Sequence, residues 1–522
     1  MADLEVPVLI VGGSLVGMST ALLLAHHGVR AMVVEHHRGT AIHPRAALIN
    51  QRTMEILRLV GVEQIVRARS EQQFVQDGAL VAVESLAGKE LAAIIPNLNE
   101  GIRDVSPTVR LFITQSLLEP LLKSRAEELG AHLRFGTEMI SFEQDSDGVT
   151  ALIRDRDSGQ VNRVRARYMV GADGSHSRVR QQLGIALHGR GVISHSVTIY
   201  FRAHVGPLLR GRNLSVILVR NPTLRGFFRI EKPFESGFLV VNTVGDPQHP
   251  NTDVSTGLTN ERSIEYLHAA FGTSDVPATI ENVMHWKATA DVAERLQERR
   301  VFLAGDAAHV MPPYGGFGGN CGIHDAHNLA WKLAMVLKGE AGESLLATYE
   351  PERLPAGKFT TEQAYARYVT REATYLGTEG MQPVENDLNI ELGYRYHSAA
   401  VIPEPGDNGS HHEHPRESKG KPGTRAPHIW LSQDRSTLDL FGSKFVLLTG
   451  ANGDAWIAAA LRLPMDVHRI GHVEFPGSYG ITDSGAVLVR PDGFVGWRAK
   501  TAEGASEELL RGVLEEIVGC SV

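Results

Sequence analysis

A glycine-rich turn between an apolar run and a helical stretch constrains the fold of this chain more than any other feature. Residues 6–11 (VPVLIV) are apolar and rich in β-branched side chains, which predicts a short buried strand. The turn 12–17 (GGSLVG) follows, and residues 18–27 are expected to form a helix that ends before Gly28. Residues 31–35 predict a second strand, which ends at a glutamate. This order of elements is a βαβ unit, which belongs to a parallel α/β sheet.

The same turn has the chemistry of a dinucleotide site. Its glycines allow a tight turn and a close approach of the backbone, and the following helix directs its N-terminal N–H groups and positive dipole end at a pyrophosphate. Glu35, 23 positions after Gly12, is expected to accept hydrogen bonds from ribose hydroxyls, which favours FAD or NAD over NADP. Ser14 stands at the usual middle glycine, and an ordinary strand–turn–helix is the alternative interpretation.

A second glycine turn with an acidic residue lies in residues 168–180. A strand there ends in Asp173 and Gly174, and the turn leads into a helix that carries Arg178 and Arg180. Because arginine suits phosphate geometry, both arginines are candidates for pyrophosphate contacts, with surface salt bridges as the alternative.

A third turn of this kind follows much later in the chain. Residues 301–304 predict a buried strand that ends at Gly305 and Asp306, and a glycine-rich loop then leads to a helix expected over residues 322–337. The turn presents a carboxylate and a second positive helix end. Asp306 is therefore expected to hold sugar or ribityl hydroxyls, and the helix end to stabilise negative charge on a reduced ring system.

In this order along the chain, the three turns resemble those of the class A FAD-dependent aromatic monooxygenases, which have the hydroxybenzoate-hydroxylase-type fold. The resemblance spans roughly residues 5–375, and the branch that looks most similar is that of the bacterial aromatic polyketide hydroxylases. It implies an α/β fold in which a Rossmann-like FAD-binding domain is interleaved with an antiparallel-sheet substrate domain. A C-terminal thioredoxin-like domain without a CxxC motif is expected to follow.

The resemblance also implies the residues that contact FAD. Arg45 and Gln115 match contact positions of the family outside the three turns, and Phe317 stands where many members have a polar residue. The predicted FAD-binding residues are Gly12, Ser14, Leu15, Val16, Gly17, Glu35, Arg45, Gln115, Asp173, Gly174, Asp306, Pro313, Gly316, Gly318, Gly319 and Asn320.

The chain is expected to divide into consecutive parts. The expected ranges are 1–190 for the first part of the FAD-binding domain, 191–290 for the middle substrate-binding sheet domain, 291–400 for the second part of the FAD-binding domain and its helices, 401–427 for a linker and 428–522 for the thioredoxin-like domain.

In the last of these parts the pattern predicts alternating strands and helices. Residues 445–449 are expected to form a strand, 454–461 a helix, 486–498 a hairpin with an Asp-Gly turn, and 501–518 an amphipathic helix. Cys520 is the one cysteine here, so dithiol redox chemistry is excluded, and structural support or contact between protomers is expected.

The reaction is also implied by the resemblance. NAD(P)H, which visits transiently, reduces FAD, O₂ adds at the flavin C4a carbon, and the C4a-hydroperoxide passes one oxygen to an activated ring. The protein supplies orientation, electrostatics and exclusion of water. The implied substrate is a small-molecule aromatic polyketide from antibiotic biosynthesis. Baeyer–Villiger oxidation of a polyketide ketone and antibiotic-inactivating hydroxylation are alternatives on the same scaffold, and a non-catalytic flavin-binding accessory protein is a further one.

The substrate region is expected between residues 192 and 286. Residues 196–202 alternate polar and apolar side chains, which predicts an antiparallel strand with one buried face. Residues 238–242 are largely apolar, which predicts a strand buried on both faces. Aromatic residues here are candidates for an apolar pocket that takes a flat polycycle, with plain core packing as the alternative. The predicted pocket residues are Arg225, Phe227, Phe228, Phe238, Trp286 and Phe317.

A base or an anion-stabilising group is expected near the ring, because deprotonation of a phenol helps its hydroxylation. No spacing singles out one residue, and the catalytic residue stays unassigned. The candidates are Arg225, Tyr365, Arg367, Arg371, His309 and His324.

Composition limits the other functions. The formal net charge of -8 argues against a nucleic-acid binder. His411, His412 and His414 lie in a stretch rich in Pro, Gly and charge, so exposed side chains are favoured over a metal site, and no metal is expected. The 2 cysteines fit a reducing, cytoplasmic compartment. Residues 6–25 are uncharged, but their acidic N-terminal flank and their glycines argue against a signal peptide or a membrane span. A homodimer is also considered.

Overall fold

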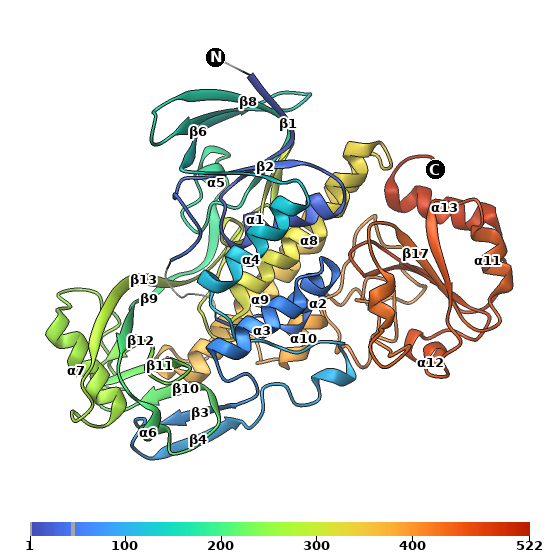
Figure 1. Cartoon of the computed structure of the whole chain (residues 1–522). Coiled ribbons are helices and arrows are strands. Elements are labelled where there is room, and N and C mark those ends of the chain that lie inside the picture. Colours follow the sequence, from blue (N-terminus) through green and yellow to red (C-terminus); the bar gives the residue numbers. More distant parts are fainter. Residues whose placement is uncertain (1–2, 43–46) are drawn as a thin grey trace.

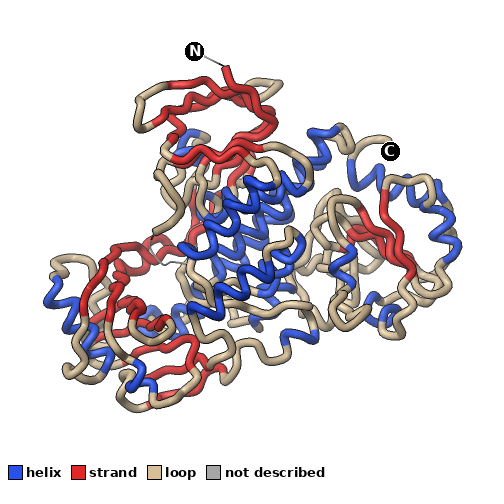
Figure 2. The backbone as a smooth tube through the Cα atoms, viewed as in Figure 1, coloured by secondary structure: helices blue, strands red, loops and turns tan. Residues whose placement is uncertain are grey.

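In the computed structural model, which describes residues 3–42 and 47–522, the chain forms three β-sheets arranged around a central group of helices (Figure 1). The strands gather in three separate regions, and the long helices lie between them (Figure 2). The first sheet contains both N-terminal strands of the predicted βαβ unit, and the third belongs to the C-terminal part.

The first sheet is mainly parallel and is built on the βαβ unit. β1 pairs in parallel with β2 and with β8, and β15 pairs in parallel with β8. Helix α1 (Leu15–His26) follows β1 and packs against α4 (Gln115–Glu128) and α8 (Phe317–Lys338). The predicted unit is confirmed, with a helix that begins three residues earlier than expected. The strands are β1 (Asp3–Val11), β2 (Ala31–Glu35), β5 (His132–Phe135), β6 (Thr137–Gln144), β7 (Val149–Asp155), β8 (Val161–Gly171), β14 (Gln297–Glu298) and β15 (Val301–Leu303).

The second sheet is antiparallel except for one parallel pair, β10 with β3. It runs in the order β16-β13-β9-β12-β11-β10-β3-β4, so residues 79–95 join strands that come more than a hundred residues later. The elements are β3 (Ala79–Val83), β4 (Glu90–Ile95), β9 (Leu187–Arg202), α6 (Gly206–Leu209), β10 (Leu214–Arg220), β11 (Leu224–Glu231), β12 (Ser236–Val244), α7 (Asn260–Phe271), β13 (Thr279–Ala293) and β16 (His309–Val310).

Both faces of the second sheet are covered, which corrects one prediction. Residues 196–201 of β9 are all buried, so this strand is buried on two faces and not on one. Helix α7 covers one face, where Phe271 stacks on Phe228, and side chains that include Phe74, Leu98 and Phe112 pack on the other. The alternation of polar and apolar residues gave the wrong prediction because the polar residues of this strand form hydrogen bonds on the face opposite α7, where Ser196 bonds to Asn242 and Thr198 to Trp286. The expected two-sided burial of residues 238–242 in β12 is confirmed.

The third sheet has the order β18-β17-β19-β20 and forms the C-terminal part with its helices. The predicted strand 445–449 and the antiparallel hairpin are confirmed. The last helix begins at Glu507 and not at residue 501, because the Ser506 side chain accepts a hydrogen bond from the Leu509 N–H and caps it there. The elements are β17 (Phe445–Thr449), α11 (Asp454–Ala460), β18 (Met465–Arg469), α12 (Phe475–Tyr479), β19 (Ala486–Val489), β20 (Val495–Ala499) and α13 (Glu507–Val518).

A buried ionic cluster joins the central helices to the third sheet. Glu352 accepts from Lys332 Nζ at 2.7 Å and from Arg490 Nη1 at 2.6 Å, and Arg490 also pairs with Asp492 at 2.5 Å. Burial alone would raise the pKa of the Glu352 carboxyl, but Arg490 and Lys332 lower it below its usual range. Buried ion pairs therefore join the central helices to the third sheet.

Shorter helices and turns connect these layers. Among the described residues, none of the helices combines the length and apolar character that a membrane crossing requires. The remaining elements are α2 (Gln51–Leu59), α3 (Glu63–Gln73), η1 (Ile102–Asp104), α5 (Arg178–Gln182), η2 (Gly305–Ala307), η3 (Glu343–Thr348), α9 (Tyr349–Arg371), η4 (Thr374–Leu376), α10 (Asp387–Leu392) and η5 (Thr437–Leu440).

Candidate active site

The first turn can be built only from glycine at its key positions. Gly12 has a φ of +102°, and a Cβ added to it would lie 2.3 Å from the carbonyl oxygen of Ala172. A Cβ on Gly17 would lie 1.8 Å from the carbonyl oxygen of Gly12. At these positions no side chain therefore covers the backbone before α1, as the approach of a pyrophosphate requires.

The three turns, distant in sequence, converge in the structure. Gly12 packs against Ala172 beside the second turn, and Gly305 of the third turn lies against Val16, so that an added Cβ would meet Val16 Cγ2 at 2.7 Å. Arg180 joins the second turn to the third, since its Nη1 donates to the carbonyl of Ala307 at 3.0 Å. All three turns thus lie together at the carboxyl ends of parallel strands, where α/β sheets bind ligands.

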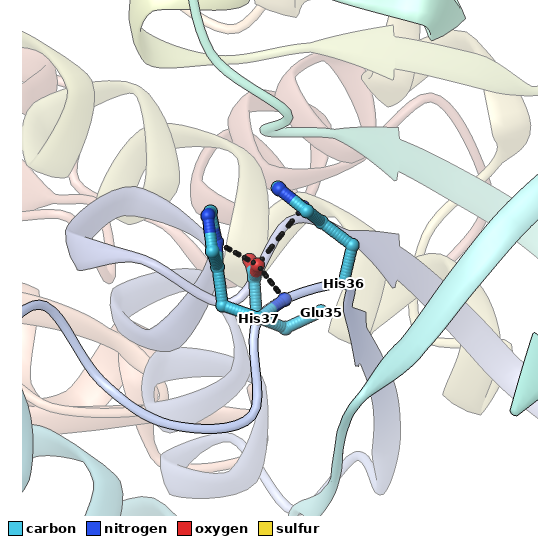
Figure 3. Close-up of side chains that lie close together, drawn as sticks. All are labelled: Glu35, His36 and His37. Atoms are coloured by element: carbon cyan, nitrogen blue, oxygen red, sulfur yellow. Dashed lines mark hydrogen bonds and ion pairs between the residues drawn. The ribbon is translucent and has the colours of Figure 1, made fainter. Parts of the chain in front are cut away.

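Glu35 holds a fixed carboxylate at the end of β2 (Figure 3). Its Oε2 accepts from the Gly13 N–H at 2.7 Å, and its Oε1 accepts from the His37 N–H at 2.8 Å. The Nδ1 atoms of His36 and His37 lie 3.0 and 2.7 Å from Oε1. The ligand atoms of these three residues lie close enough for a metal, but the backbone donors already explain why the carboxylate is placed here. It lies beside the first turn, where a ribose is expected.

Ser14, the departure from the glycine motif, has a structural reason. Its hydroxyl donates to Glu119 Oε1 at 2.6 Å and accepts from Gln115 Nε2 at 2.6 Å, which ties α1 to α4. Glu119 also accepts from the Ala41 N–H at 2.7 Å. Gln115 therefore lies next to the first turn. Glu119, which sequence reasoning missed, is signalled only by its spacing of four residues from Gln115 on one helix face.

The second turn is held by its own carboxylate. Asp173 accepts from Ser177 Oγ, the N-cap of helix α5, at 2.5 Å and from the Val179 N–H in the first turn of that helix at 3.1 Å. Arg180 binds the two backbone carbonyls of Ala307 and Ser175, so it acts as a bridge between turns. Arg178 is exposed.

The third turn leads into α8, which begins at Phe317, five residues before the expected start. Gly316 caps it with a φ of +66° and packs so closely on Leu48 that an added Cβ would lie 2.7 Å from Cδ2. Asn320 uses its amide on backbone: it accepts from the Asn50 N–H at 2.9 Å and donates to the carbonyls of Leu48 at 2.9 Å and Gly316 at 2.7 Å. Asn320 therefore holds the backbone of residues 48–50 next to the third turn.

The other predicted contact residues lie at the same place, with one outside the described part of the chain. Leu15 and Val16 open α1, Gly174 has a φ of +81°, and Asp306 and Pro313 are exposed on the third turn. Gly318 and Gly319 lie in the first turn of α8. Arg45 lies outside the described residues.

A buried polar cluster lies behind the third turn. His309 Nε2 is 2.8 Å from Asp325 Oδ2, and Arg353 donates to Asp325 Oδ1 at 2.7 Å and to Cys321 Sγ at 3.3 Å. The His309, Cys321 and Asp325 ligand atoms are close enough for a metal, but the Arg353 guanidinium already supplies the positive charge there. His324, the other histidine considered as a base, stacks on Tyr394, which packs with Tyr396 and Phe494.

One face of the second sheet carries the predicted aromatic wall. Side chains two residues apart share a face. In the register of β9, β11 and β12, Phe227 and Phe238 therefore lie on the inner face. Trp286 lies on this face too and donates from Nε1 to Thr198 Oγ1 at 3.0 Å. Phe228 points to the opposite face against α7, so its predicted place in the pocket is wrong.

Phe317 lies apart from this wall. It packs on Ala364 and Ile390, and the Arg367 guanidinium lies 5.3 Å from its ring centroid. Arg367 itself pairs with Asp387 at 2.5 Å, and Tyr365 lies under the guanidinium of Arg190. Phe317, Arg367 and Tyr365 therefore each already have a partner.

A polar group that sequence reasoning missed lies between the third turn and the inner sheet face. Tyr314 follows Pro313 directly, and its ring centroid lies 6.1 Å from that of Phe227. Asn242 Nδ2 donates to the Tyr314 hydroxyl at 2.9 Å, and Glu372 lies buried close by. No sequence pattern signals this group, because its members come from β12, the third turn and the end of α9.

The arrangement fits FAD. The bare glycine backbone and helix end suit a pyrophosphate, Glu35 suits a ribose, and Gly316 at the start of α8 presents a second positive helix end to a flavin. The aromatic sheet face begins where the third turn ends, through the contact of Phe227 with Tyr314.

Comparison with known families gives the same result over most of the chain. Residues 5–364 match the family model described as an FAD binding domain. Residues 419–520 match the model described as the C-terminal domain of aromatic-ring hydroxylases.

Individual relatives resemble the chain over nearly its whole length. It is 52% identical to a 4-methyl-5-nitrocatechol 5-monooxygenase from a Burkholderia species, covering 98% of both chains. It is 38% identical to the tetracenomycin A2 monooxygenase-dioxygenase of Streptomyces glaucescens, covering 99% of this chain and 98% of that one. The crystal structure of aklavinone-11 hydroxylase with FAD and aklavinone superposes with a TM-score of 0.91 at 36% identity, covering 99% of this chain and all of that one.

Proposed function

This chain belongs to the FAD-dependent aromatic-ring hydroxylases, and from that premise we propose that it hydroxylates a phenolic ring of a polycyclic aromatic polyketide with NAD(P)H and O₂. The observation that carries the proposal is the contact between Phe227 of the inner sheet face and Tyr314 of the third turn. It brings an apolar aromatic wall directly beside the turn that faces the flavin. A relative with 38% identity over 99% of this chain is named for its action on a tetracenomycin.

The chain's own residues hold and orient the cofactor. The backbone of the first turn, around Gly12, would hold the pyrophosphate, and Glu35 the ribose. The α8 N-terminus at Gly316 would stabilise negative charge on the ring system. When bound, FAD supplies the hydride-accepting and oxygen-activating chemistry.

The inner sheet face orients the substrate and excludes water. Phe227, Phe238 and Trp286 offer flat apolar surfaces to a planar ring system, and the indole N–H of Trp286 is already satisfied by Thr198. Asn242 and Tyr314 add hydrogen-bonding groups at one edge of this wall. A mainly apolar wall with a few polar groups is the usual composition of a small-molecule site.

A smaller, monocyclic nitrocatechol is a second candidate substrate. The observation that favours it is the 52% identity, over 98% of both chains, with a relative named for 4-methyl-5-nitrocatechol. Both candidates present an acidic phenolic hydroxyl, so the same wall and the same cofactor turns serve either one.

The experiment measures NADPH and NADH oxidation by the purified holoenzyme with aklavinone, with 4-methyl-5-nitrocatechol and with no substrate. Substrate-stimulated oxidation together with an oxygenated product whose rings are intact supports hydroxylation, and the faster substrate decides between the two candidates. A lactone product would instead support Baeyer–Villiger oxidation. Cofactor oxidation that no aromatic compound stimulates would overturn the proposal and favour an accessory role.

A reducing, cytoplasmic setting is part of the same proposal. Cys321 is buried in α8 and Cys520 lies beyond α13, and both are free thiols. Free thiols of this kind are ordinary in a compartment that keeps cysteines reduced.

A further inference from the structure

We propose that Glu372 accepts the proton of the substrate's phenolic hydroxyl and that it does so through the hydroxyl of Tyr314. This inference rests on the proposed hydroxylation of a phenol and assigns the base that the sequence leaves open. Glu372 does not touch the substrate itself, so it acts on the reaction through Tyr314.

The first observation is a buried carboxyl group that, among the described residues, forms no salt bridge and lies beside the Tyr314 hydroxyl. Glu372 caps the C-terminus of α9, and its side chain is 0% exposed. Within the described part of the chain, neither of its carboxyl oxygens forms a hydrogen bond of standard geometry, and the hydroxyl that lies near enough to interact with the carboxyl is that of Tyr314. Buried polar groups are nearly always paired, because leaving one unpaired costs about 1–3 kcal/mol. A carboxyl group that stays buried without a salt bridge or a hydrogen bond of standard geometry therefore indicates a functional role for it.

The second observation is the charge around this carboxyl. Arg225 Nη1 donates to the main-chain carbonyl of Glu372 at 3.4 Å, and Arg220 donates to the carbonyl of Arg371. Neither arginine forms a salt bridge with the Glu372 carboxyl, although both attract it electrostatically. The titratable and charged groups that face it are Arg220 from β10, Arg225 from β11, Tyr314 from the third turn, Tyr368 from α9 and Tyr375 from η4.

These surroundings bring the pKa of the Glu372 carboxyl close to neutral pH. Burial raises the pKa of the Glu372 carboxyl to about 8, against the opposing effect of Arg220 and Arg225. A base is most efficient when its pKa lies near the working pH. A carboxyl of ordinary pKa would be too weak a base to take a proton from a phenol.

Tyr314 connects this carboxyl to the substrate wall. Burial and the nearby Glu372 carboxyl raise the pKa of Tyr314. Asn242 Nδ2 donates to the Tyr314 oxygen at 2.9 Å, and Asn242 is itself oriented by a hydrogen bond of 3.2 Å from Ser196 Oγ. Since Asn242 occupies one acceptor position, the Tyr314 hydroxyl keeps its proton to donate and a second lone pair to accept. The Tyr314 ring packs against Phe227 of the wall.

The proton transfer balances without any further reactant. The O–H bond of the substrate breaks, its proton passes to the Tyr314 oxygen, and the proton that Tyr314 carried passes to a Glu372 oxygen. The products are a substrate phenolate, a neutral tyrosine and a neutral carboxyl group, and no electron changes centre. The phenolate ring is richer in electrons than the phenol and therefore accepts an electrophilic oxygen more readily. The proton returns by the same route when the product phenol forms.

The test compares the holoenzyme with Glu372→Gln and Tyr314→Phe, with the exposed Glu379→Gln as the matched control. Glutamine has the shape of glutamate and does not titrate, and the FAD absorbance of each variant checks that it is folded. We expect both test variants to lose about 10²-fold in kcat near neutral pH, with little change in KM. Their rates should rise towards alkaline pH, where the substrate ionises in solution. A pH profile and rate equal to those of Glu379→Gln would overturn the proposal.

A second readout does not depend on turnover. The probe is 4-methyl-5-nitrocatechol, whose ionised form is coloured, bound to the oxidised enzyme and titrated with pH. We expect its apparent pKa to be lower in Glu372→Gln than in the wild type, because the neutral amide removes the negative charge that an ionised Glu372 places near the bound phenol. Equal values would overturn the inference even if the enzyme hydroxylates phenols. A wild type that ionises the probe but forms no oxygenated product would contradict the proposed function and leave this inference standing.

Discussion

Replacing Glu372 with glutamine should change how the stability of the protein depends on pH. Burial raises the pKa of this carboxyl from 4.5 to about 8, so the folded chain keeps a proton that the unfolded chain releases. Below about pH 4.5 both states are protonated and the residue costs nothing, and the cost grows as the pH rises to about 8. The difference, 8 minus 4.5, is 3.5 pKa units at about 1.4 kcal/mol each, which gives about 5 kcal/mol at pH 9 and about 3 kcal/mol at pH 7.

The assay is denaturant-induced unfolding of the wild type and of Glu372→Gln at pH 5, 7 and 9. Glutamine does not titrate. The free energy of unfolding of the variant should therefore rise relative to that of the wild type by these amounts as the pH rises. Glu379→Gln, on the exposed segment seven residues further on, should keep a constant difference. A difference between Glu372→Gln and the wild type that does not vary with pH would refute the reasoning.

Three further predictions concern other parts of the structure. Gly12→Ala should abolish FAD binding, because its Cβ would lie 2.3 Å from a backbone carbonyl oxygen, and flavin absorbance after gel filtration measures this. Glu352→Ala should lower the free energy of unfolding by about 3–5 kcal/mol, since it leaves the buried Lys332 without an anionic partner and Arg490 with Asp492 alone. The exposed Glu340→Ala should change it little, and equal effects in denaturant melts would count against the buried cluster. Phe227→Ala should raise KM for the aromatic substrate. Phe228→Ala, on the opposite sheet face, should lower the free energy of unfolding by about 3–5 kcal/mol and leave KM unchanged. Steady-state kinetics and thermal melts measure both effects, and a KM raised by Phe228→Ala but not by Phe227→Ala would contradict the prediction.

The local parts of the fold could be predicted from sequence because their signals are local. The βαβ unit follows from the apolar run, the glycines of the turn and Glu35, all within about thirty residues. The start of α13 had a local signal as well, since Ser506 followed by acidic residues is a typical N-cap, and the amphipathic pattern alone placed it too early.

Features that depend on distant partners could not be predicted. Residues 196–201 alternate polar and apolar side chains, yet both faces are covered, one of them by α7. Phe227 and Phe228 are adjacent in sequence, and only the strand register shows which of the two lies on the inner face. Had the period of two been applied to this strand, the sequence would have shown that they cannot both line one pocket.

The polar groups of the site are the least predictable. Glu372 looks like any acidic residue at a helix end, and its burial depends on β10, β11 and the third turn. Asn320, predicted at the cofactor, holds the backbone of Leu48 and Asn50, a role that no motif carries. Ser14 departs from the glycine motif because it bonds to Glu119, more than a hundred residues away.

The central claim is that three turns, at Gly12, Asp173 and Asp306, converge to bind one FAD. Its most direct measurement is the amount of FAD released per chain when the purified holoenzyme, saturated with FAD and freed of excess, is denatured. The convergence of the turns predicts one FAD for each chain. A chain that retains no flavin, or that binds two, would contradict it.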